Sequence, residues 1–423
     1  MKTTARFLPV LILALSLAFL SGCKEEPRGD YGPINAYDFS MQHRNDAAKI
    51  AAEKERVFKV DVSPNSRYMP DLAVMLPDSC PTPAGMALDT QSGRIFVNVP
   101  NVAPLDPQGK PEYPALLCSF SNRHDLRIEL EYPAGSVPMG LTFGPDGNLY
   151  AADACGEAGQ AGALRVEMKD GKATGSVTKL VSGLHHPTAL VWQDGSLYVT
   201  DSEIPEANAE KAPSAIGYGG VWRFAADELQ TGTLAATPEK HLWATCPVYE
   251  IGRKDNHGLG GIVSAWGALY AGNYGDGLVF RLTPGEGAKA NVEKVVDNPL
   301  THCSAGMFYD PASDLIYVCD SQANAVRTLD KDLKVEWIWL NGDTTGDDGS
   351  LDQPLDCVVR GDVLFVSNFD VPEKGFKNQL GPDKAYSISR ISLAMPEEPV
   401  KEPPAEPKIE LPELPAETVP EGN

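Results

Sequence analysis

Histidine and carboxylate residues recur at matched points along this chain of 423 residues. Four of the seven histidines lie directly before short apolar segments, at His185, His186, His257 and His302. Carboxylate or amide side chains end another set of apolar segments, at Asp153, Asp201, Asn273, Asp320 and Asn368. Imidazole nitrogens and carboxylate oxygens bind divalent metals such as Zn²⁺, and both groups serve as general bases. These side chains are therefore the candidate functional residues.

Two hypotheses account for this pattern. In the first, a divalent metal is the cofactor, and its ligands are drawn from His186, His257, His302, Asp201 and Asp320. In the second, the Asp and Asn side chains cap turns through backbone amides, and the histidines form a polar rim. The choice depends on the elements that carry these residues and on whether those elements converge.

The elements are revealed by an internal repeat. Six times the chain gives a small apolar segment, a turn with Gly or Asp, and an aromatic-aliphatic segment that usually ends on a polar residue. The copies begin at Pro83, Pro138, Pro187, Leu259, Ser304 and Pro354. Turns such as 145–148 and 194–196 contain the Asp-Gly pairs that tight hairpins favour. Each copy therefore predicts two antiparallel strands.

Further strand-like segments follow most copies. Third strands are predicted at 277–282 and 324–329, and fourth strands at 126–132, 177–181, 292–296 and 335–340. Four antiparallel strands recurring about every 50 residues are typical of a propeller blade. The fold class is therefore an all-β, six-bladed β-propeller. In this fold the loops before first strands and after second strands share one face, so the candidate residues lie on that face.

The last copy lacks a fourth strand after its third, Tyr386 to Leu393. The alternating segment from Val57 to Val62 precedes the first blade and is the predicted donor. This N-terminal strand would close the ring by pairing with the last blade, which protects an otherwise exposed edge.

The motifs Leu197-Tyr198-Val199-Thr200-Asp201-Ser202 and Gly272-Asn273-Tyr274-Gly275-Asp276-Gly277 resemble those of NHL-repeat propellers and of the gluconolactonase/senescence-marker-protein superfamily. The resemblance spans residues 80–393. It implies a propeller that binds a partner or hydrolyses a lactone or ester with a central divalent metal.

The metal ligands of that superfamily are a Glu, two Asn and an Asp on different blades. Here the Glu-Gly-Pro position reads Pro83-Ala84-Gly85, and the Asn-Gly-Leu position reads Thr188-Ala189-Leu190. The Asp-Gly pair is absent from Ser304-Ala305-Gly306. None of the four ligands is present at its expected place, which disfavours a gluconolactonase. Basic residues for a quinone cofactor and a Cys-x-x-Cys-His haem motif are also not found.

An export signal precedes the repeats. Lys2 and Arg6 are followed by an apolar run from Phe7 to Leu20, which is short for a membrane span. Leu20-Ser21-Gly22-Cys23 resembles the lipobox of bacterial lipoproteins, which implies cleavage before Cys23 and lipidation of its thiol. Lys24 resembles a signal for the outer membrane. We therefore expect a lipid-anchored protein of the cell envelope, on the periplasmic or surface side.

The expected domains are a signal peptide at 1–22, a lipidated tether with a short helix at 23–56, the propeller at 57–395 and a disordered tail at 396–423. The tail contains eight Pro and eight Glu and no aromatic residue, so it cannot bury a core. The net charge of −22 argues against nucleic acid as a partner. A binding or scaffold function for a protein or a small ligand is the main expectation, and a metal-dependent hydrolase is the alternative.

Seven cysteines remain once Cys23 is assigned to lipid. In an oxidising compartment they can pair, and the odd number leaves at least one thiol over. Cys303 opens and Cys319 closes one predicted hairpin, which would place their Cα atoms near the ~5.5 Å that a disulfide prefers. A Cys303–Cys319 bridge is therefore predicted, with Cys357 as the alternative partner of Cys303.

Overall fold

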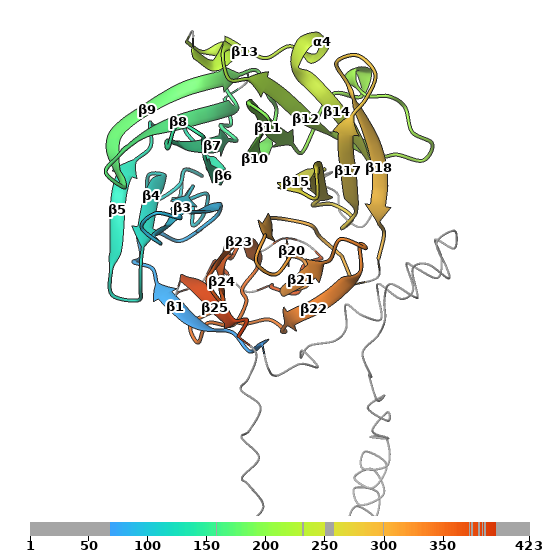
Figure 1. The fold of residues 1–423 in the computed structure, drawn as a ribbon. Helices are drawn as coiled ribbons and strands as arrows, with labels where there is room; N and C mark the ends of the chain where they lie inside the picture. Colours follow the sequence, from blue (N-terminus) through green and yellow to red (C-terminus); the bar gives the residue numbers. More distant parts are fainter. Residues whose placement is uncertain are drawn as a thin grey trace, which may run out of the picture.

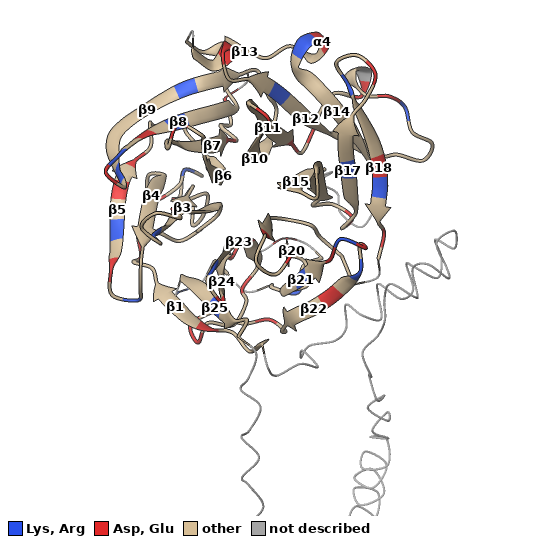
Figure 2. Ribbon diagram, in the orientation of Figure 1, with Lys and Arg blue, Asp and Glu red and all other residues tan. Residues whose placement is uncertain are grey.

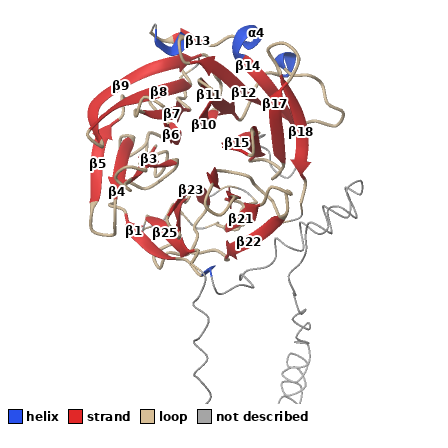
Figure 3. Ribbon diagram, viewed as in Figure 1, coloured by secondary structure: helices blue, strands red, loops and turns tan. Residues whose placement is uncertain are grey.

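The computed structural model describes residues 68–394 except 158, 231, 250–257, 299, 372, 374, 380, 383 and 385. These residues form six sheets around a common axis, each with four antiparallel strands, so the predicted six-bladed propeller is confirmed (Figure 1). Strands dominate and the helices are short and peripheral (Figure 3). No helix in the described part of the chain has the length and apolar character needed to span a membrane. The predicted leader, the tether, Cys23, Val57 to Val62, His257 and the tail lie outside the described residues.

The first three blades each follow the order of the chain from the axis outward. Blade 1 consists of β2 (Met86–Leu88), β3 (Ile95–Val99), β4 (Leu116–Phe120) and β5 (Leu126–Glu131). Blade 2 consists of β6 (Pro138–Phe143), β7 (Leu149–Asp153), β8 (Gly162–Lys169) and β9 (Lys172–Ser182). Blade 3 consists of β10 (Pro187–Gln193), β11 (Ser196–Asp201), β12 (Gly217–Ala225) and β14 (Leu242–Val248).

Blade 3 also explains the longest interval between repeat copies. Its third and fourth strands are separated by α4 (Pro238–His241) and by β13 (Leu234–Ala235), which pairs in parallel with β9 of blade 2. Two 3₁₀ turns, η2 (Glu206–Asn208) and η3 (Glu228–Gln230), flank β12. These additions extend the rim of the propeller and leave the four-stranded blade intact.

The last three blades repeat the pattern. Blade 4 consists of β15 (Leu259–Ala265), β16 (Ala268–Asn273), β17 (Val279–Pro284) and β18 (Ala290–Val296). Blade 5 consists of β19 (Met307–Asp310), β20 (Leu315–Asp320), β21 (Ala325–Leu329) and β22 (Val335–Leu340). Blade 6 consists of β23 (Pro354–Arg360), β24 (Val363–Asn368), β25 (Ser387–Ser392) and β1 (Asp71–Met75).

The outermost strand of blade 6 comes from the N-terminal side of the first blade, as predicted. The strand that does this is β1, which pairs antiparallel with β25. The prediction that Val57 to Val62 occupies this place is therefore wrong. Val57 to Val62 has the more regular apolar alternation, but Asp71–Met75 lies closer in sequence to β2, and a short connection is the common solution in compact domains.

The second strands are apolar on both faces because each blade is packed between two others. Every residue of β3, β7, β11 and β16 is buried, and in β24 only the first residue, Val363, is partly exposed. Outer strands such as β5 and β18 are largely exposed and carry charged side chains (Figure 2). Each seam between neighbouring blades has its own apolar cluster among the described residues, so the core is a ring of six such clusters.

Small residues allow the first strands to approach one another at the axis. A Cβ atom on Gly85 would lie 2.3 Å from the Met139 carbonyl oxygen of the next blade. A Cβ atom on Gly261 would lie equally close to the Ala305 oxygen. The Gly85 amide donates to the Met139 oxygen at 3.1 Å, and the Gly306 amide donates to the Leu355 oxygen at 2.6 Å. The blades are therefore joined by backbone hydrogen bonds at these seams.

We predict that Gly85→Ala destabilises the protein by about 2–3 kcal/mol, because the new methyl group meets backbone atoms that cannot rotate away. The matched control is Gly156→Ala, since no atom lies within 4 Å of a Cβ at Gly156. Urea unfolding of both variants measures the difference. Equal stability of the two variants would contradict close packing at the axis.

Candidate functional site

Asp201, at the end of β11, binds the backbone of its own blade. Its Oδ2 accepts the His185 amide at 3.0 Å, and its Oδ1 accepts the His186 amide at 2.6 Å. The Trp222 indole nitrogen donates to Oδ2 at 3.1 Å. Asp201 is fully buried. This carboxylate therefore holds the turn that precedes β10, which is the capping function of the second hypothesis.

Asp320, at the end of β20, acts in the same way in blade 5. It accepts the His302 amide at 2.9 Å and the Ala323 amide at 3.0 Å. Burial alone would raise the pKa of Asp320, but the charge of Arg327, at 3.2 Å, and hydrogen bonds from His302 hold that pKa below its usual value. Asp320 is therefore an ionised structural group in a buried ion pair.

The remaining strand-end residues also bind within or close to their own blades. Asp153 accepts the Val137 amide at 2.8 Å, and Asn368 accepts the Asp352 amide at 3.1 Å. Asn273 accepts the Gly275 amide at 3.0 Å. The recurrence of acidic and amide side chains along the sequence thus follows from a recurring turn that needs an acceptor.

The described histidines are not gathered into a metal site. Nowhere in the described ranges do three His, Cys, Asp or Glu side chains come together in a group able to hold a metal ion. His302 is buried with its Nδ1 atom 3.7 Å from Asp320, and His185 makes the corresponding contact with Asp201. Contact with Asp201 raises the pKa of His185 despite partial burial. The proposed metal set therefore does not assemble from His186, His302, Asp201 and Asp320, because both carboxylates are occupied by backbone amides.

The propeller axis holds a cavity of about 570 Å³ that the first strands of all six blades line. Its lining extends from His186 and Ser202, on the face where first strands begin, to Phe143 and Tyr309, where first strands end. Most of the lining is aliphatic, aromatic or glycine. The described lining includes two carboxylates, Asp356 and Glu373, and neither Lys nor Arg. The cavity is thus an apolar chamber with an acidic bias.

Glu373 lies at the mouth of the cavity, in the loop between β24 and β25. It accepts a hydrogen bond from the Tyr274 hydroxyl, which follows β16, at 2.9 Å. Phe376 of the same loop packs against Tyr274 with ring centroids 6.1 Å apart. A loop of blade 6 therefore reaches past blade 5 to blade 4 and borders the entrance.

Asp356 takes the place of a small residue in the repeat. The corresponding positions of the other five copies are Gly85, Gly140, Ala189, Gly261 and Gly306. The Asp356 Oδ2 atom accepts the Met86 amide of blade 1 at 2.8 Å, and its Oδ1 atom accepts the Cys357 amide at 2.9 Å. A Cβ on Gly306 would lie 2.2 Å from Oδ1. The carboxyl thus fills the space that glycine leaves at the seams of blades 5, 6 and 1.

The environment of Asp356 perturbs its ionisation. Burial raises the pKa of this carboxyl to about 7, and the hydrogen bonds from Met86 and Cys357 oppose the rise only in part. A carboxyl that titrates near neutrality beside a cavity is suited to bind a cation or to exchange a proton with a ligand. Asp356 is therefore the principal candidate functional residue.

Sequence reasoning missed Asp356, although the repeat contained the signal. The candidate residues were those that recur in several blades, but such residues hold the turns of the fold. Alignment of the six copies at the third position shows a carboxylate where five copies have Gly or Ala. A departure from the repeat was thus the informative feature.

The predicted Cys303–Cys319 disulfide is not formed in this structure, where none of the seven described cysteines belongs to a disulfide. The backbone of Cys319 pairs with Ala305 and Gly306. Cys303 is therefore not directly opposite Cys319 across the hairpin. Both thiols are buried in the seam between blades 5 and 6, in one apolar cluster with Cys357.

Comparison with known proteins finds only distant likenesses. No family model and no curated protein matches the chain. A gluconolactonase from Xanthomonas campestris is similar at 13% identity and a TM-score of 0.45, covering 79% of this chain and 100% of the other. A PQQ-bound aldose sugar dehydrogenase from Streptomyces coelicolor is similar at 11% identity and a TM-score of 0.49, covering 78% of this chain and 99% of the other. Virginiamycin B lyase from Staphylococcus aureus is similar at 12% identity and a TM-score of 0.41, covering 76% of this chain and 98% of the other. At these identities and scores the likeness is one of fold, and no activity follows from it.

We predict that Asp356→Asn changes how stability depends on pH. The folded state holds the Asp356 proton more tightly than the unfolded chain, whose carboxyl has a pKa of 3.8. This contribution to stability is fully present below about pH 4 and is lost as the pH rises through about 7. The unfolding free energy of wild type minus that of Asp356→Asn should therefore fall by roughly 2–4 kcal/mol as the pH rises from about 4 to about 7.

Urea unfolding at half-unit pH steps measures this difference. Asp314→Asn is the control, because its carboxyl is exposed and the pKa of Asp314 is lowered by hydrogen bonds from Trp266 and Tyr309. The unfolding free energy of wild type minus that of Asp314→Asn should instead rise with pH, because the folded state favours the ionised Asp314 carboxylate. A wild-type-minus-Asp356→Asn difference that is flat with pH would show that Asp356 ionises normally.

Proposed function

We propose that this protein is a lipid-anchored binding propeller of the cell envelope that takes a small, mainly apolar cation into its axial cavity. The observation that carries the proposal is the described lining of this cavity, which joins apolar residues from the first strands of all six blades to the carboxyl of Asp356.

The size of the cavity favours a small molecule. Ligand sites commonly measure about 300–1,000 Å³ and combine apolar walls with a few polar groups that set orientation. A volume of about 570 Å³ falls within this range. The main contribution to affinity would come from removing apolar ligand surface from water, while Asp356 would set the orientation.

The sign of the charges favours a cation. Asp356 and Glu373 both lie in the described lining, to which neither Lys nor Arg contributes. The whole chain has a net charge of −22, which attracts cations toward its surface. A protonated amine on an apolar body would contribute its own charge to Asp356 and would thereby favour the ionised carboxylate.

The anchor belongs to the same proposal. Leu20-Ser21-Gly22-Cys23 supports lipidation at Cys23, and acyl chains hold a protein on a bilayer without a spanning helix. The segment from 24 to 56 and the Pro/Glu-rich tail would serve as tethers that leave the propeller free in the periplasm or at the cell surface.

A second candidate function is hydrolysis of a lactone or ester. Asp356 favours it, since a carboxyl with a pKa near 7 is suited to general acid–base catalysis. The metal-dependent form of this hypothesis would require His257 or other residues beyond those described. Turnover of lactone and ester substrates, with and without added Zn²⁺, Mg²⁺ or Ca²⁺, distinguishes an enzyme from a binding protein.

We predict that naphthylmethylamine binds more tightly than naphthylmethanol or naphthoate at pH 8, because only the amine offers a positive charge to Asp356. The expected preference over the alcohol is about tenfold or more, which corresponds to a hydrogen bond with a charged partner. Isothermal titration calorimetry measures it. Asp356→Asn should remove the preference and leave binding of the alcohol nearly unchanged.

Glu293→Gln is the matched control for net charge, because Glu293 is exposed on β18, far out in its blade, and does not line the cavity. It should retain the preference for the amine. Equal affinity of wild type for all three compounds would contradict recognition of a cation by the cavity.

We also predict that Cys23→Ser releases the protein from membranes. Without the thiol no acyl chain can be attached, so the chain should move from the membrane fraction to the soluble envelope fraction or should retain its leader. Fractionation and intact mass of the N-terminal peptide measure this. An unmodified Cys23 in the membrane-isolated wild type would contradict the anchor.

A further inference from the structure

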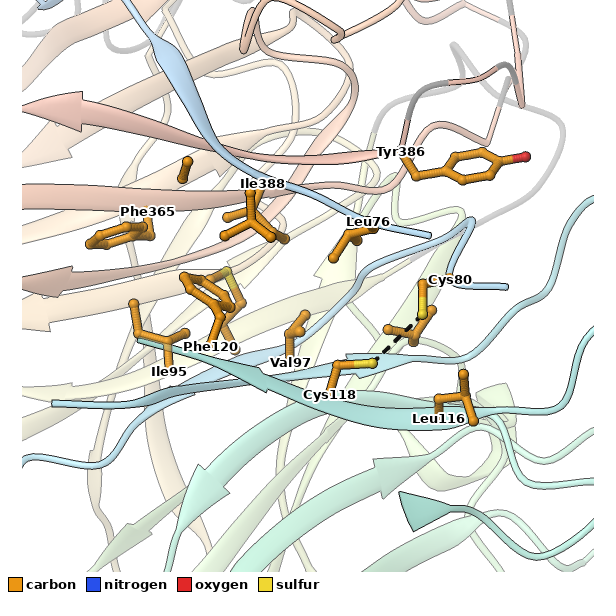
Figure 4. Packing of buried hydrophobic residues seen from close by; sticks show 14 of the residues in the cluster. Leu76, Cys80, Ile95, Val97, Leu116, Cys118, Phe120, Phe365, Tyr386 and Ile388 are labelled. Carbon is orange, nitrogen blue, oxygen red and sulfur yellow. Dashed lines mark hydrogen bonds between the residues drawn. The ribbon is translucent and has the colours of Figure 1, made fainter. Parts of the chain in front are cut away.

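Two buried cysteines meet where the propeller ring closes. The Cys80 and Cys118 sulfurs lie 3.6 Å apart, and both side chains are fully buried (Figure 4). Cys80 is in the connection from β1 to β2, and Cys118 is in the middle of β4. Neither residue was part of the predicted disulfide.

The position of Cys80 relates it to ring closure. β1 completes blade 6, and the chain then passes directly through Cys80 into blade 1. Leu76 and Cys80 pack in one apolar cluster with Ile388 of blade 6 and with Val97 and Leu116 of blade 1 (Figure 4). A bond from Cys80 to β4 would therefore tie the closing segment to the blade on the far side of the seam.

We propose that Cys80 and Cys118 form a disulfide that covalently secures the closure of the ring. The sulfurs need to approach by roughly 1.5 Å to reach bonding distance, a movement within the range of side-chain rotation. The pair spans 38 positions of the chain, and a link over such an interval restricts the unfolded state strongly.

The chemistry is exchange with a disulfide-bearing oxidant, either oxidised glutathione or an envelope thiol oxidoreductase. One cysteine thiolate attacks the oxidant, forms a mixed disulfide and releases one thiol. The other cysteine loses its proton and attacks the sulfur of the mixed disulfide, which releases the second thiol. The two cysteines lose two protons and two electrons, and the oxidant gains them.

The direct contact between the sulfurs differentiates the two thiols. Their hydrogen bond lowers the pKa of Cys80 and raises the pKa of Cys118, with burial adding to the rise. This difference belongs to the folded state, where the two sulfurs are in contact. Since both sulfurs are shielded in the folded protein, the exchange occurs during folding, before the seam closes.

Formation in the cell rests on the proposed export, because cytosolic thiols are kept reduced. The experiment separates the two claims by refolding the full chain from urea in a buffer of reduced and oxidised glutathione. Free thiols are then blocked with N-ethylmaleimide before trypsin digestion. Trypsin separates the cysteines into peptides 68–94 and 95–123, each with one cysteine.

Mass spectrometry without reductant should find these two peptides linked. Two peptides that both carry N-ethylmaleimide would overturn the proposal. The location of the protein is read separately, by fractionation of cells, so a cytosolic location would refute the proposed envelope function without deciding the refolding result.

Variants test whether the bond stabilises the ring. Cys80→Ala, Cys118→Ala and the double variant should each lower the melting temperature by roughly 3–8 °C, and by similar amounts, because each removes the same bond. Reductant should lower the melting temperature of refolded wild type and leave the variants unchanged. Cys246→Ala is the control: its side chain is equally buried, in an apolar cluster that contains no other described cysteine.

The control variant loses packing only, so reductant should still lower its melting temperature as in wild type. Additive losses for Cys80→Ala and Cys118→Ala, together with no effect of reductant on wild type, would show two packed thiols and would overturn the proposal.

Discussion

The close approach of six first strands around one axis is the constraint on which the structure depends. At Gly85 and Gly261 a Cβ atom would meet a carbonyl oxygen of the next blade at 2.3 Å. Glycine removes that obstacle, so amides and carbonyls of neighbouring blades bond directly, as Gly306 and Leu355 do at 2.6 Å. Blades held this close cover both faces of their neighbours, and the second strands are consequently almost entirely buried and mostly apolar.

Departures from this arrangement show where function can be placed. In blade 3, the Thr200 hydroxyl accepts the Ala189 amide and donates to the Gly260 oxygen at 2.7 Å across the seam. In blade 6, the Asp356 amide bonds the Ser367 hydroxyl, and the Asp356 carboxyl accepts the Met86 amide of blade 1. A side chain thus replaces a direct backbone contact at the seam where the chain closes. The same replacement introduces a carboxyl to the cavity and raises its pKa.

Closure of the ring distinguishes blade 6 from the others in two further respects. Its outer strand, β1, comes from the far end of the propeller sequence, so its stability depends on pairing between segments more than 300 residues apart. Its long loop carries Glu373 to Tyr274 at the mouth of the cavity. The pairing of β1 with β25 and the two carboxylates of the described cavity lining therefore occur in the same blade.

The sequence by itself determined the blade count, the strand pairs of each blade and the face on which strand-end residues lie. It could do so because hairpin turns and apolar strands are local features; Gly147 and Asp194, for example, have the positive φ angles of 79° and 48° that their turn motifs predicted. Only the tertiary structure decided what the strand-end residues do. The sequence pattern favoured Asp201 and Asp320 as metal ligands, but in the folded protein both carboxylates accept backbone amides of the turns.

Contacts between distant segments decided the rest. The choice of β1 over Val57 to Val62 depends on which segment lies beside β25 in the folded protein. The local alternation of apolar residues does not indicate which segment that is. Cys80 and Cys118 are neighbours only because closure of the ring folds one connection against β4. The raised pKa of Asp356 arises from burial between blades 5, 6 and 1, an environment that exists only once the ring has formed.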